Sequence, residues 1–352
     1  MPSFRTGTVR AILTQRPGLQ RVEVDLPDGA RSRAYVLTDL IGDVDVGDEV
    51  VLNTTAIELG LGTGGWHVVH WNLARREHRS PGPGHIMKLR YTSLQADTGA
   101  VEELEADVLA EADDVVGMPV VACGLHSQVP CVAAAFKHVQ PDARVAYVMT
   151  DGAALPLALS DLVAAMCDAG LVDTTITAGQ AFGGMREAVN VASALVAAHR
   201  VDRADLAIVA MGPGVVGTAT RLGYSALEVS GILDAATRVG GRPVAALRFS
   251  LADERRRHQG VSHHTATALG MAPRSTIGVP GGSYEERVRA DLEAAGLADR
   301  HDLLPVDDPD VPALLALRRL HVTSMGRTAA DDPGFFAVAG AAGTAAATLI
   351  QP

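Results

Sequence analysis

Polar side chains with the chemistry of an active site follow several apolar runs of the sequence. His126 and Ser127 come directly after the run PVVACGL, Asp151 comes after RVAYVMT, and Gln180 comes after DTTITAG. The run PVAALRFS contains Arg248 near its end. Histidine and carboxylate groups exchange protons near neutral pH, and a guanidinium binds carboxylates and phosphates. We therefore predict a site in which His126 and Asp151 transfer protons while Arg248 holds an anion.

A second polar stretch, DERRRHQGVSHHTATALG (residues 253–270), holds three arginines and three histidines before a predicted helix. A basic loop of this kind attracts an anionic ligand. We assign His263 to proton transfer and His264 to ligand binding. Neighbouring histidines usually point apart, and no HExxH or HxH pattern is present, so we predict no metal ligands here. The alternative is a metal site assembled across loops from His126, Asp151 and His263.

The stretch ADLAIVAMGPGVVGTATRLG, residues 204–223, changes from an apolar strand pattern to a GxGxxG spacing. We expect these glycines to join a strand to a helix, where backbone N–H groups can approach an anion. A dinucleotide site would need an acidic residue at the end of the next strand, whereas Glu228 and Asp234 fall within a predicted helix. A phosphate or carboxylate is thus the expected ligand, with a purely structural turn as the alternative. The predicted ligand-binding residues of this loop and of the AFGG turn are Gly212, Gly214, Gly217, Thr218, Gly183 and Gly184.

The elements that must position these groups are apolar strands that alternate with alanine-rich helices after about residue 86. Nearly continuous, β-branched apolar runs are typical of strands that helices cover on both faces. Residues 86–352 are therefore predicted to form a doubly wound, mostly parallel α/β domain. Ligands bind such sheets outside the carboxyl ends of the strands, so the polar residues above are expected to meet at one edge. Gly170 and Gly240 are expected to end two of the helices in the left-handed conformation.

Residues 1–80 have a different pattern and are predicted to form a small antiparallel β-barrel. Short alternating runs such as GTVRAIL, QRVEVDL, SRAYVLT and GDEVVLNTT are separated by turn residues, and no long helix is expected. The segment RREHRSPGPGH, residues 75–85, suits a linker between the two domains.

Charge and composition limit the classes of partner. The chain of 352 residues has a net charge of -11 and 4% aromatic residues, which argues against nucleic-acid and anionic-membrane binding. The N-terminal residues lack a signal-peptide core, and no apolar run is long enough to span a bilayer, so a cytoplasmic location is expected. The three cysteines show no CxxC spacing, which fits a reducing compartment.

Missing motifs narrow the possible reactions. No GxxxxGK[ST] sequence occurs, which excludes a P-loop NTPase. Lys88 and Lys137 are the only lysines, so an enzyme that forms a Schiff base with pyridoxal phosphate is disfavoured. No cofactor is indicated by the sequence.

Five segments together resemble a bacterial family known as domain of unknown function 3866. They are GHIMKLRYTSLQ, TDGAALPLALSDLV, AFGGMREAVNVASAL, GPGVVGTATRLG and HQGVSHHTATALG. The resemblance extends over most of the chain and implies that the two-part layout and its loops form one recurring design. It brings no catalytic residues that can be carried over. Met185 stands where we would have expected an acidic residue, so position 185 is not assigned a ligand role.

These features favour an enzyme, a hydrolase or a group-transfer enzyme, that acts on an anionic small molecule. The alternative is a non-catalytic protein that senses a ligand or binds a protein or RNA partner through its barrel. A homodimer that buries the apolar stretch FFAVAGAAGTAAATLI is a further expectation. Binding through the barrel would be favoured if one face gathered its arginines, which are Arg10, Arg16, Arg21, Arg31 and Arg33.

Overall fold

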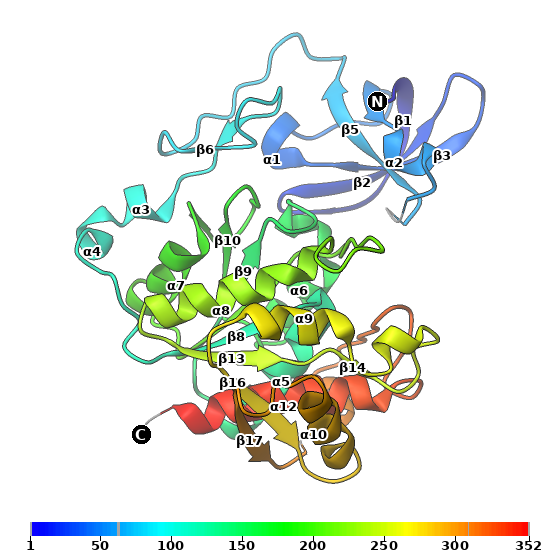
Figure 1. Ribbon diagram of the computed structural model, residues 1–352. Coiled ribbons are helices and arrows are strands. Elements are labelled where there is room, and N and C mark those ends of the chain that lie inside the picture. Colours follow the sequence, from blue (N-terminus) through cyan, green and yellow to red (C-terminus); the bar gives the residue numbers. More distant parts are fainter. Residues whose placement is uncertain (1, 62–63, 309, 351–352) are drawn as a thin grey trace. The chain divides into compact units, whose positions relative to one another are not determined.

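The computed structural model describes residues 2–61, 64–308 and 310–350 (Figure 1). The chain divides into two compact units, Met1–Thr98 and Gly99–Pro352. The first unit contains a closed barrel, and the second contains a large parallel sheet covered by helices. The predicted architecture of a small barrel followed by an α/β domain is confirmed.

The barrel has five strands in the order β1-β2-β3-β5-β4. Strands β3 and β5 pair in parallel, while the other pairs are antiparallel. Alternate residues such as Val22, Val24 and Leu52 point inward and are fully buried, which is the period-two pattern read from the sequence. The strands are β1 (Phe4–Arg16), β2 (Leu19–Asp25), β3 (Arg31–Val36), β4 (Glu49–Asn53) and β5 (Trp66–Asn72), and the helices are the four-residue α1 (Thr38–Ile41) and α2 (Thr55–Glu58).

The segment after the barrel has little regular structure. Residues 75–85 form neither helix nor strand, as expected of the linker composition. Strand β6 (Met87–Lys88) then pairs with β7 (Ala96–Asp97). Both short strands belong to the first compact unit, which extends to Thr98.

The second unit is built on eight parallel strands in the order β11-β10-β9-β12-β8-β13-β16-β17. All five strands predicted from apolar runs are present. The stretch MREAVNVASALVAAHR, residues 185–200, has apolar residues at helical spacing and predicts a helix, but its first part forms edge strand β11, and the helix begins only after the N-cap Asn190. The strands are β8 (Pro119–Cys123), β9 (Val145–Thr150), β10 (Thr174–Ala178), β11 (Arg186–Ala188), β12 (Leu206–Met211), β13 (Arg242–Ala246), β16 (Thr276–Pro280) and β17 (Asp302–Val306).

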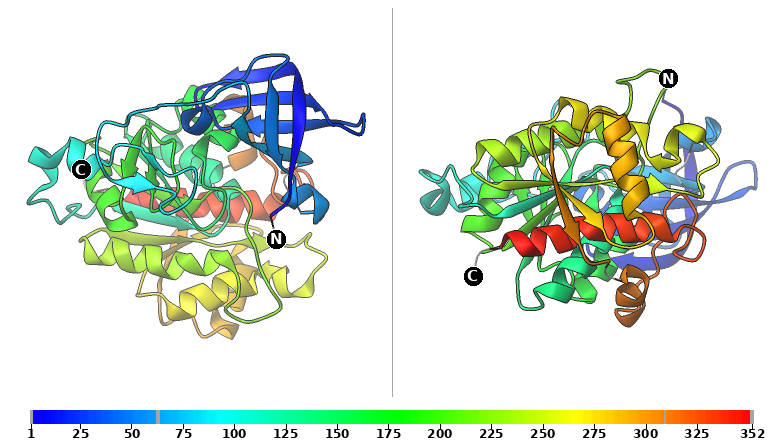
Figure 2. Two further views of the ribbon diagram at one scale, coloured as in Figure 1. Left: turned by 90° about the horizontal axis from the view of Figure 1, so that it is seen from above. Right: turned by 60° about the horizontal axis from the view of Figure 1, so that its bottom comes forward.

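Two apolar cores lie on opposite faces of this sheet. In β8, Val120 and Ala122 belong to one core, whereas Val121 and Cys123 belong to the other. This division gives the doubly wound arrangement (Figures 1 and 2). The first core includes side chains of α7 (Val191–Arg200), α8 (Val229–Arg238), α9 (His263–Met271) and α10 (Glu285–Ala294), and the second includes those of α5 (Val129–Val139), α6 (Asp161–Asp168), α11 (Val311–Leu317) and α12 (Pro333–Leu349). As predicted, Gly170 and Gly240 follow α6 and α8 with φ of +66° and +71°.

Helix α12 is deeply buried in the second core. Fourteen of its 17 residues are buried within the unit, and the red helix runs along the sheet in Figure 2. Its backbone approaches α5 so closely that a Cβ atom on Gly343 would collide with the carbonyl oxygen of Val132. The helix therefore does not offer the apolar face to a second copy that the sequence suggested. Within the described residues, no helix is both long enough and apolar enough to cross a membrane.

Candidate functional site

The carboxyl ends of the parallel strands form one edge of the sheet. Strand β8 lies between β12 and β13. After β8 the chain continues to β9, on the side of the sheet where β12 lies. After β12 it crosses to β13, on the opposite side of β8. The connections therefore reverse direction at β8, which makes its carboxyl end a topological switch point. The strand register places Cys123 beside Ala210 and Ala246. The segments that follow β8, β12 and β13 therefore start close together at this edge.

Residues 212–224 form an irregular loop rather than the start of a helix. Gly217 pairs with Tyr224 in an isolated bridge, and helical structure begins only with the 3-10 helix η3 (Ser225–Glu228). The expected direct connection from strand to helix is thus wrong, and binding of an anion by this loop stays a prediction. The reason is local: Thr218 donates its N–H to the carbonyl of Gly223 at 2.7 Å, which closes a turn where the helix was expected.

The three glycines of this loop have different roles. A Cβ atom at Gly212 would lie 2.5 Å from the carbonyl oxygen of Ala154, so this glycine permits close packing. Gly214 has a φ of +106° and open space around it, whereas Gly217 packs beside Tyr224 and His264. The loop turns a corner at its start and then covers the histidine-rich segment.

Glu228 is the residue of this edge that sequence reasoning overlooked. Its carboxylate accepts a 2.7 Å hydrogen bond from the hydroxyl of Thr150 at the end of β9. Burial raises the pKa of Glu228 to about 7, and the charge of Asp151 adds to this effect. The glutamate was placed within a helix and set aside, because a single sequence does not show that the loop before it folds back onto β9. A carboxyl group with this pKa is suited to proton transfer.

The predicted catalytic residue His126 is buried among protein partners. Its Nε2 lies 2.7 Å from the hydroxyl of Ser160, and its Nδ1 lies 3.1 Å from the hydroxyl of Tyr147. Burial lowers the pKa of His126 to about 4. Ser160 also caps α6. The contacts of His126 therefore join β8, β9 and α6.

Asp151 and His263 make their contacts in two other groups. The carboxylate of Asp151 is exposed and accepts the backbone N–H of Gln180 at 2.9 Å, after β10. His263 lies with His258 and His264 at the start of α9. The structure thus places His126, Asp151 and His263 in three different groups of contacts, and their shared catalytic role stays a prediction.

The backbone N–H groups of the two glycines in the AFGG turn, residues 181–184, donate hydrogen bonds to neighbouring side chains. Gly183 donates its N–H to the carboxylate of Glu187 at 2.7 Å, and Gly184 donates to the hydroxyl of Thr177 at 3.2 Å. These bonds fold the turn onto strands β10 and β11. Neither of these two N–H groups therefore points to an open ligand position, and Met185 next to them is 71% exposed.

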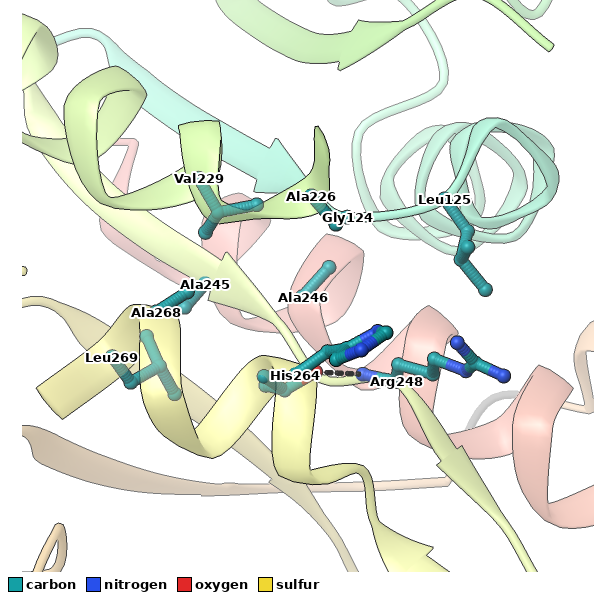
Figure 3. A pocket seen from close by; sticks show the side chains of 11 residues that line it. Gly124, Leu125, Ala226, Val229, Ala245, Ala246, Arg248, His264, Ala268 and Leu269 are labelled. Atoms are coloured by element: carbon teal, nitrogen blue, oxygen red, sulfur yellow. Dashed lines mark hydrogen bonds between the residues drawn. The ribbon is translucent and has the colours of Figure 1, made fainter. Parts of the chain in front are cut away.

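Arg248 follows β13, as predicted, and is only 8% exposed. Its side chain lines a pocket with Gly124, Leu125, Ala226 and His264 (Figure 3). The cavity volume is about 10 Å³, room for about one water molecule. Burial, together with the charge of Arg255, lowers the pKa of Arg248 to about 10.

The buried counter-ions beside Arg248 are shared among several arginines. Asp253 is 2% exposed and contacts Arg255 at 2.9 Å, Arg248 at 3.4 Å and Arg327 at 3.5 Å. Arg327 also contacts Asp332 at 3.2 Å. The network therefore contains three arginines and two carboxylates, which leaves an excess of one positive charge.

His258, His263 and His264 form the group in the described residues that could hold a metal ion. One nitrogen from each ring lies within 4.8 Å of the other two. The ring centroids of His263 and His264 are 4.2 Å apart, and that of His258 lies 5.0 and 4.9 Å from them. The sequence pointed to two of these residues but not to His258, which is brought in by η4 (Arg256–His258) and the short strand β15 (Gly260–Val261).

A family model described as "Protein of unknown function (DUF3866)" matches residues 33–343. The matched segment contains strands β4 and β5 of the barrel and the whole parallel sheet, together with every side chain of the edge described above. No curated protein matches the chain.

Proposed function

We propose that this chain, which belongs to the DUF3866 family of proteins of unknown function, is an enzyme whose active site lies at the carboxyl edge of its parallel sheet. The substrate is a small molecule that carries a phosphate or a carboxylate. The reaction is a hydrolysis or a group transfer, in which Glu228 exchanges a proton with the substrate. The family gives no residue assignments, so this proposal rests on the geometry of the edge.

The buried guanidinium of Arg248 carries the proposal. It lines the small pocket at the switch point, which must widen beyond its present volume of about 10 Å³ to admit a phosphate or a carboxylate. The nearest carboxylate, that of Asp253, is 3.4 Å away and is shared with Arg255 and Arg327. A buried cation with an incomplete counter-ion favours an anionic ligand, because the ligand supplies the missing charge in a region of low dielectric constant. The exposed Arg256 and Arg257 add positive charge nearby.

Glu228 supplies the proton-transfer group of this proposal. With a pKa of about 7, it is present in both the protonated and the ionised form at neutral pH. An acid or base works best when its pKa lies near the working pH. Ala226 of the same short helix lines the pocket that contains Arg248, so the element that carries Glu228 borders this pocket.

A thermal-shift screen with phosphorylated metabolites, nucleotides, acyl-CoA and carboxylates tests the binding step. A ligand at about 100 times its dissociation constant adds roughly 2.7 kcal/mol of stability. We expect a shift for the wild type and for the surface control Arg274→Met, but none for Arg248→Met. Arg274 is exposed and pairs with Asp302 at 2.5 Å. The proposal is wrong if the panel gives no shift, or if Arg248→Met responds as the control does.

The barrel carries a second candidate function, the binding of single-stranded nucleic acid. Its strand order resembles that of OB-fold barrels, which bind oligonucleotides across strands 2 and 3. Tyr35 of β3 stacks on Trp66 at the start of the neighbouring strand β5, with ring centroids 4.8 Å apart, and the guanidinium of Arg33 lies 4.6 Å from the centroid of the Trp66 ring. Such a platform of aromatic rings and arginine stacks on unpaired bases.

Fluorescence anisotropy with a labelled oligo-uridine tests this second function. Arg33→Ala is expected to weaken binding by about tenfold, in line with the loss of one stacking contact. Arg10→Ala is the matched control, because Arg10 pairs with Glu23 and Asp25, each at 3.4 Å. Equal loss in both variants, or no binding at low salt, would rule out recognition by the platform.

A further inference from the structure

Three histidines meet where the segment after β13 enters helix α9. His258 lies at the end of η4 and is 1% exposed. His263 and His264 are the first two residues of α9, whose N-cap is Ser262. The intervening residues Gly260 and Val261 pair with β14 (Phe249–Ser250), which folds the segment back on itself. This local hairpin thus brings His258 next to His263 and His264.

Each of the three rings has one buried nitrogen that finds no hydrogen-bond partner within the described part of the chain. These atoms are Nε2 of His258, Nε2 of His263 and Nδ1 of His264. A buried polar group without a hydrogen-bond partner destabilises the folded chain. Single unsatisfied ring nitrogens also occur on His67, His78 and His199. The cluster differs from these because its three rings lie together, with one nitrogen of each within 4.8 Å of the others, so one ligand could serve all three.

The use of different ring nitrogens explains how neighbouring residues can share a ligand. Adjacent side chains on a helix point in different directions from the backbone. For this reason the sequence argued against binding of one metal ion by both His263 and His264. Nε2 lies at the far end of the His263 ring, whereas Nδ1 lies near the base of the His264 ring, so the two atoms can converge. The stacking of His264 on Tyr224, with ring centroids 3.9 Å apart and planes 5° from parallel, holds the second ring in place.

The orientation of His258 is held by a hydrogen bond of the kind found in metal sites. Its Nδ1 lies 2.7 Å from the hydroxyl of Ser262, which leaves Nε2 for the cluster. Metal-binding histidines commonly use their second ring nitrogen in this way. Burial lowers the pKa of His258, His263 and His264, and this direction favours the neutral form of imidazole, which is the form that binds metals.

We propose that His258, His263 and His264 bind one divalent transition-metal ion, zinc in the first place, and leave a fourth position for an exchangeable ligand. Three imidazoles with one open position form the ligand set of catalytic zinc sites. Zinc bonds of 2.0–2.1 Å in a tetrahedron set the ligand nitrogens about 3.3 Å apart, so side-chain shifts of about 1 Å close the present cluster. The proposal goes beyond the anion-binding function and does not depend on it.

The charges around the cluster favour an anion in the fourth position. Arg248, Arg255 and Arg257 all act on the histidines electrostatically, and they oppose a bare dication. An anionic ligand on the metal offsets this repulsion. His264 also lines the small pocket of Arg248, which would bring a metal-bound anion beside that guanidinium (Figure 3).

Zinc binding to the untagged, chelator-treated full chain tests the site directly. Isothermal titration calorimetry with zinc alone is expected to give one ion per chain for the wild type. Because even the loss of a supporting contact costs 10–100-fold in metal affinity, His263→Gln and His264→Gln are each expected to weaken binding by about 100-fold or more. His321→Gln, at an exposed histidine, is the control and should bind zinc as the wild type does.

Two results would overturn the metal site: no binding of zinc, cobalt or nickel to the wild type, or binding that both His263→Gln and His264→Gln leave unchanged. His258→Gln is a third variant, but its buried position makes folding uncertain, so far-ultraviolet circular dichroism must show native helix content first. The exchangeable position is tested with cobalt. Azide is expected to change the visible spectrum of the cobalt-loaded chain, and an unchanged spectrum would overturn that part of the proposal. These readouts need no substrate, so they are independent of the anion screen.

Discussion

Replacement of Gly343 by alanine is expected to lower the free energy of unfolding by about 2–3 kcal/mol. The new Cβ atom would meet the carbonyl oxygen of Val132 and the backbone nitrogen of Phe136, because α12 and α5 cross in backbone contact at this point. Over-packing of a well-packed core costs typically 1–3 kcal/mol, and here the neighbour is backbone rather than a flexible side chain. Urea unfolding followed by far-ultraviolet circular dichroism measures the effect.

Gly231→Ala is the matched control for this experiment. Gly231 also lies inside a helix, α8, but nothing lies within 4 Å of the position that its Cβ atom would take. Alanine forms helix more readily than glycine, so this variant is expected to gain roughly 0.5–1 kcal/mol. If Gly343→Ala were as stable as Gly231→Ala, the close crossing of α12 and α5 would be wrong.

Glu228→Gln is expected to change the pH dependence of stability by up to about 3 kcal/mol. Glu228 keeps its proton in the folded chain up to a pH of about 7, whereas in the unfolded chain it loses the proton near the ordinary pKa of 4.5. Each difference of one in pKa corresponds to 1.36 kcal/mol. The stability of the wild type therefore falls as the pH rises from about 4.5 to about 7 on account of this group. Glutamine does not ionise and escapes the loss.

Urea unfolding of both proteins between pH 5 and pH 8 tests this prediction. The stability of Glu228→Gln minus that of the wild type should rise across this range and then level off. Burial lowers the pKa of His126 to about 4, so His126 makes both proteins less stable as the pH falls from about 6.5, and its effect cancels in the difference. Glu286→Gln, at an exposed glutamate of α10, should show a flat difference. A flat difference for Glu228→Gln would contradict a buried, proton-holding carboxyl group.

The periodicity of the apolar residues was sufficient to predict the barrel and the parallel α/β sheet. It was not sufficient where contacts with distant parts of the chain decide the structure of a segment. The strands of the α/β unit are long apolar runs whose pattern leaves few alternatives. The segment Arg186–Ala188 reads as the start of a helix, yet it pairs with Ile176–Ala178 as an edge strand. Likewise, the apolar α12 reads as an interface helix, and only the packing against α5 shows that its partner is in the same chain.

The site could be predicted in outline because strand ends are visible in a sequence. Arg248 lies at the predicted edge for that reason. The positions of His258 and Glu228 depend on a hairpin and on a folded loop, respectively, and neither has a periodic pattern. His126 follows β8, as the sequence predicted, and its ring nitrogens contact a hydroxyl at the N-cap of α6 and another on β9, which the sequence did not predict.

The buried position of α12 has a consequence for synthesis of the chain. All eight strands of the sheet leave the ribosome before Pro333, but one face of the central strands is covered by a helix that comes last. Until α12 has been synthesised, the apolar residues of β8, β13 and β16 that it contacts are not covered by a helix. A nascent chain that has completed β16 but not yet α12 therefore exposes an apolar surface, and exposed apolar surface of this kind is why chaperones are needed. Its release from them would coincide with the docking of this final helix.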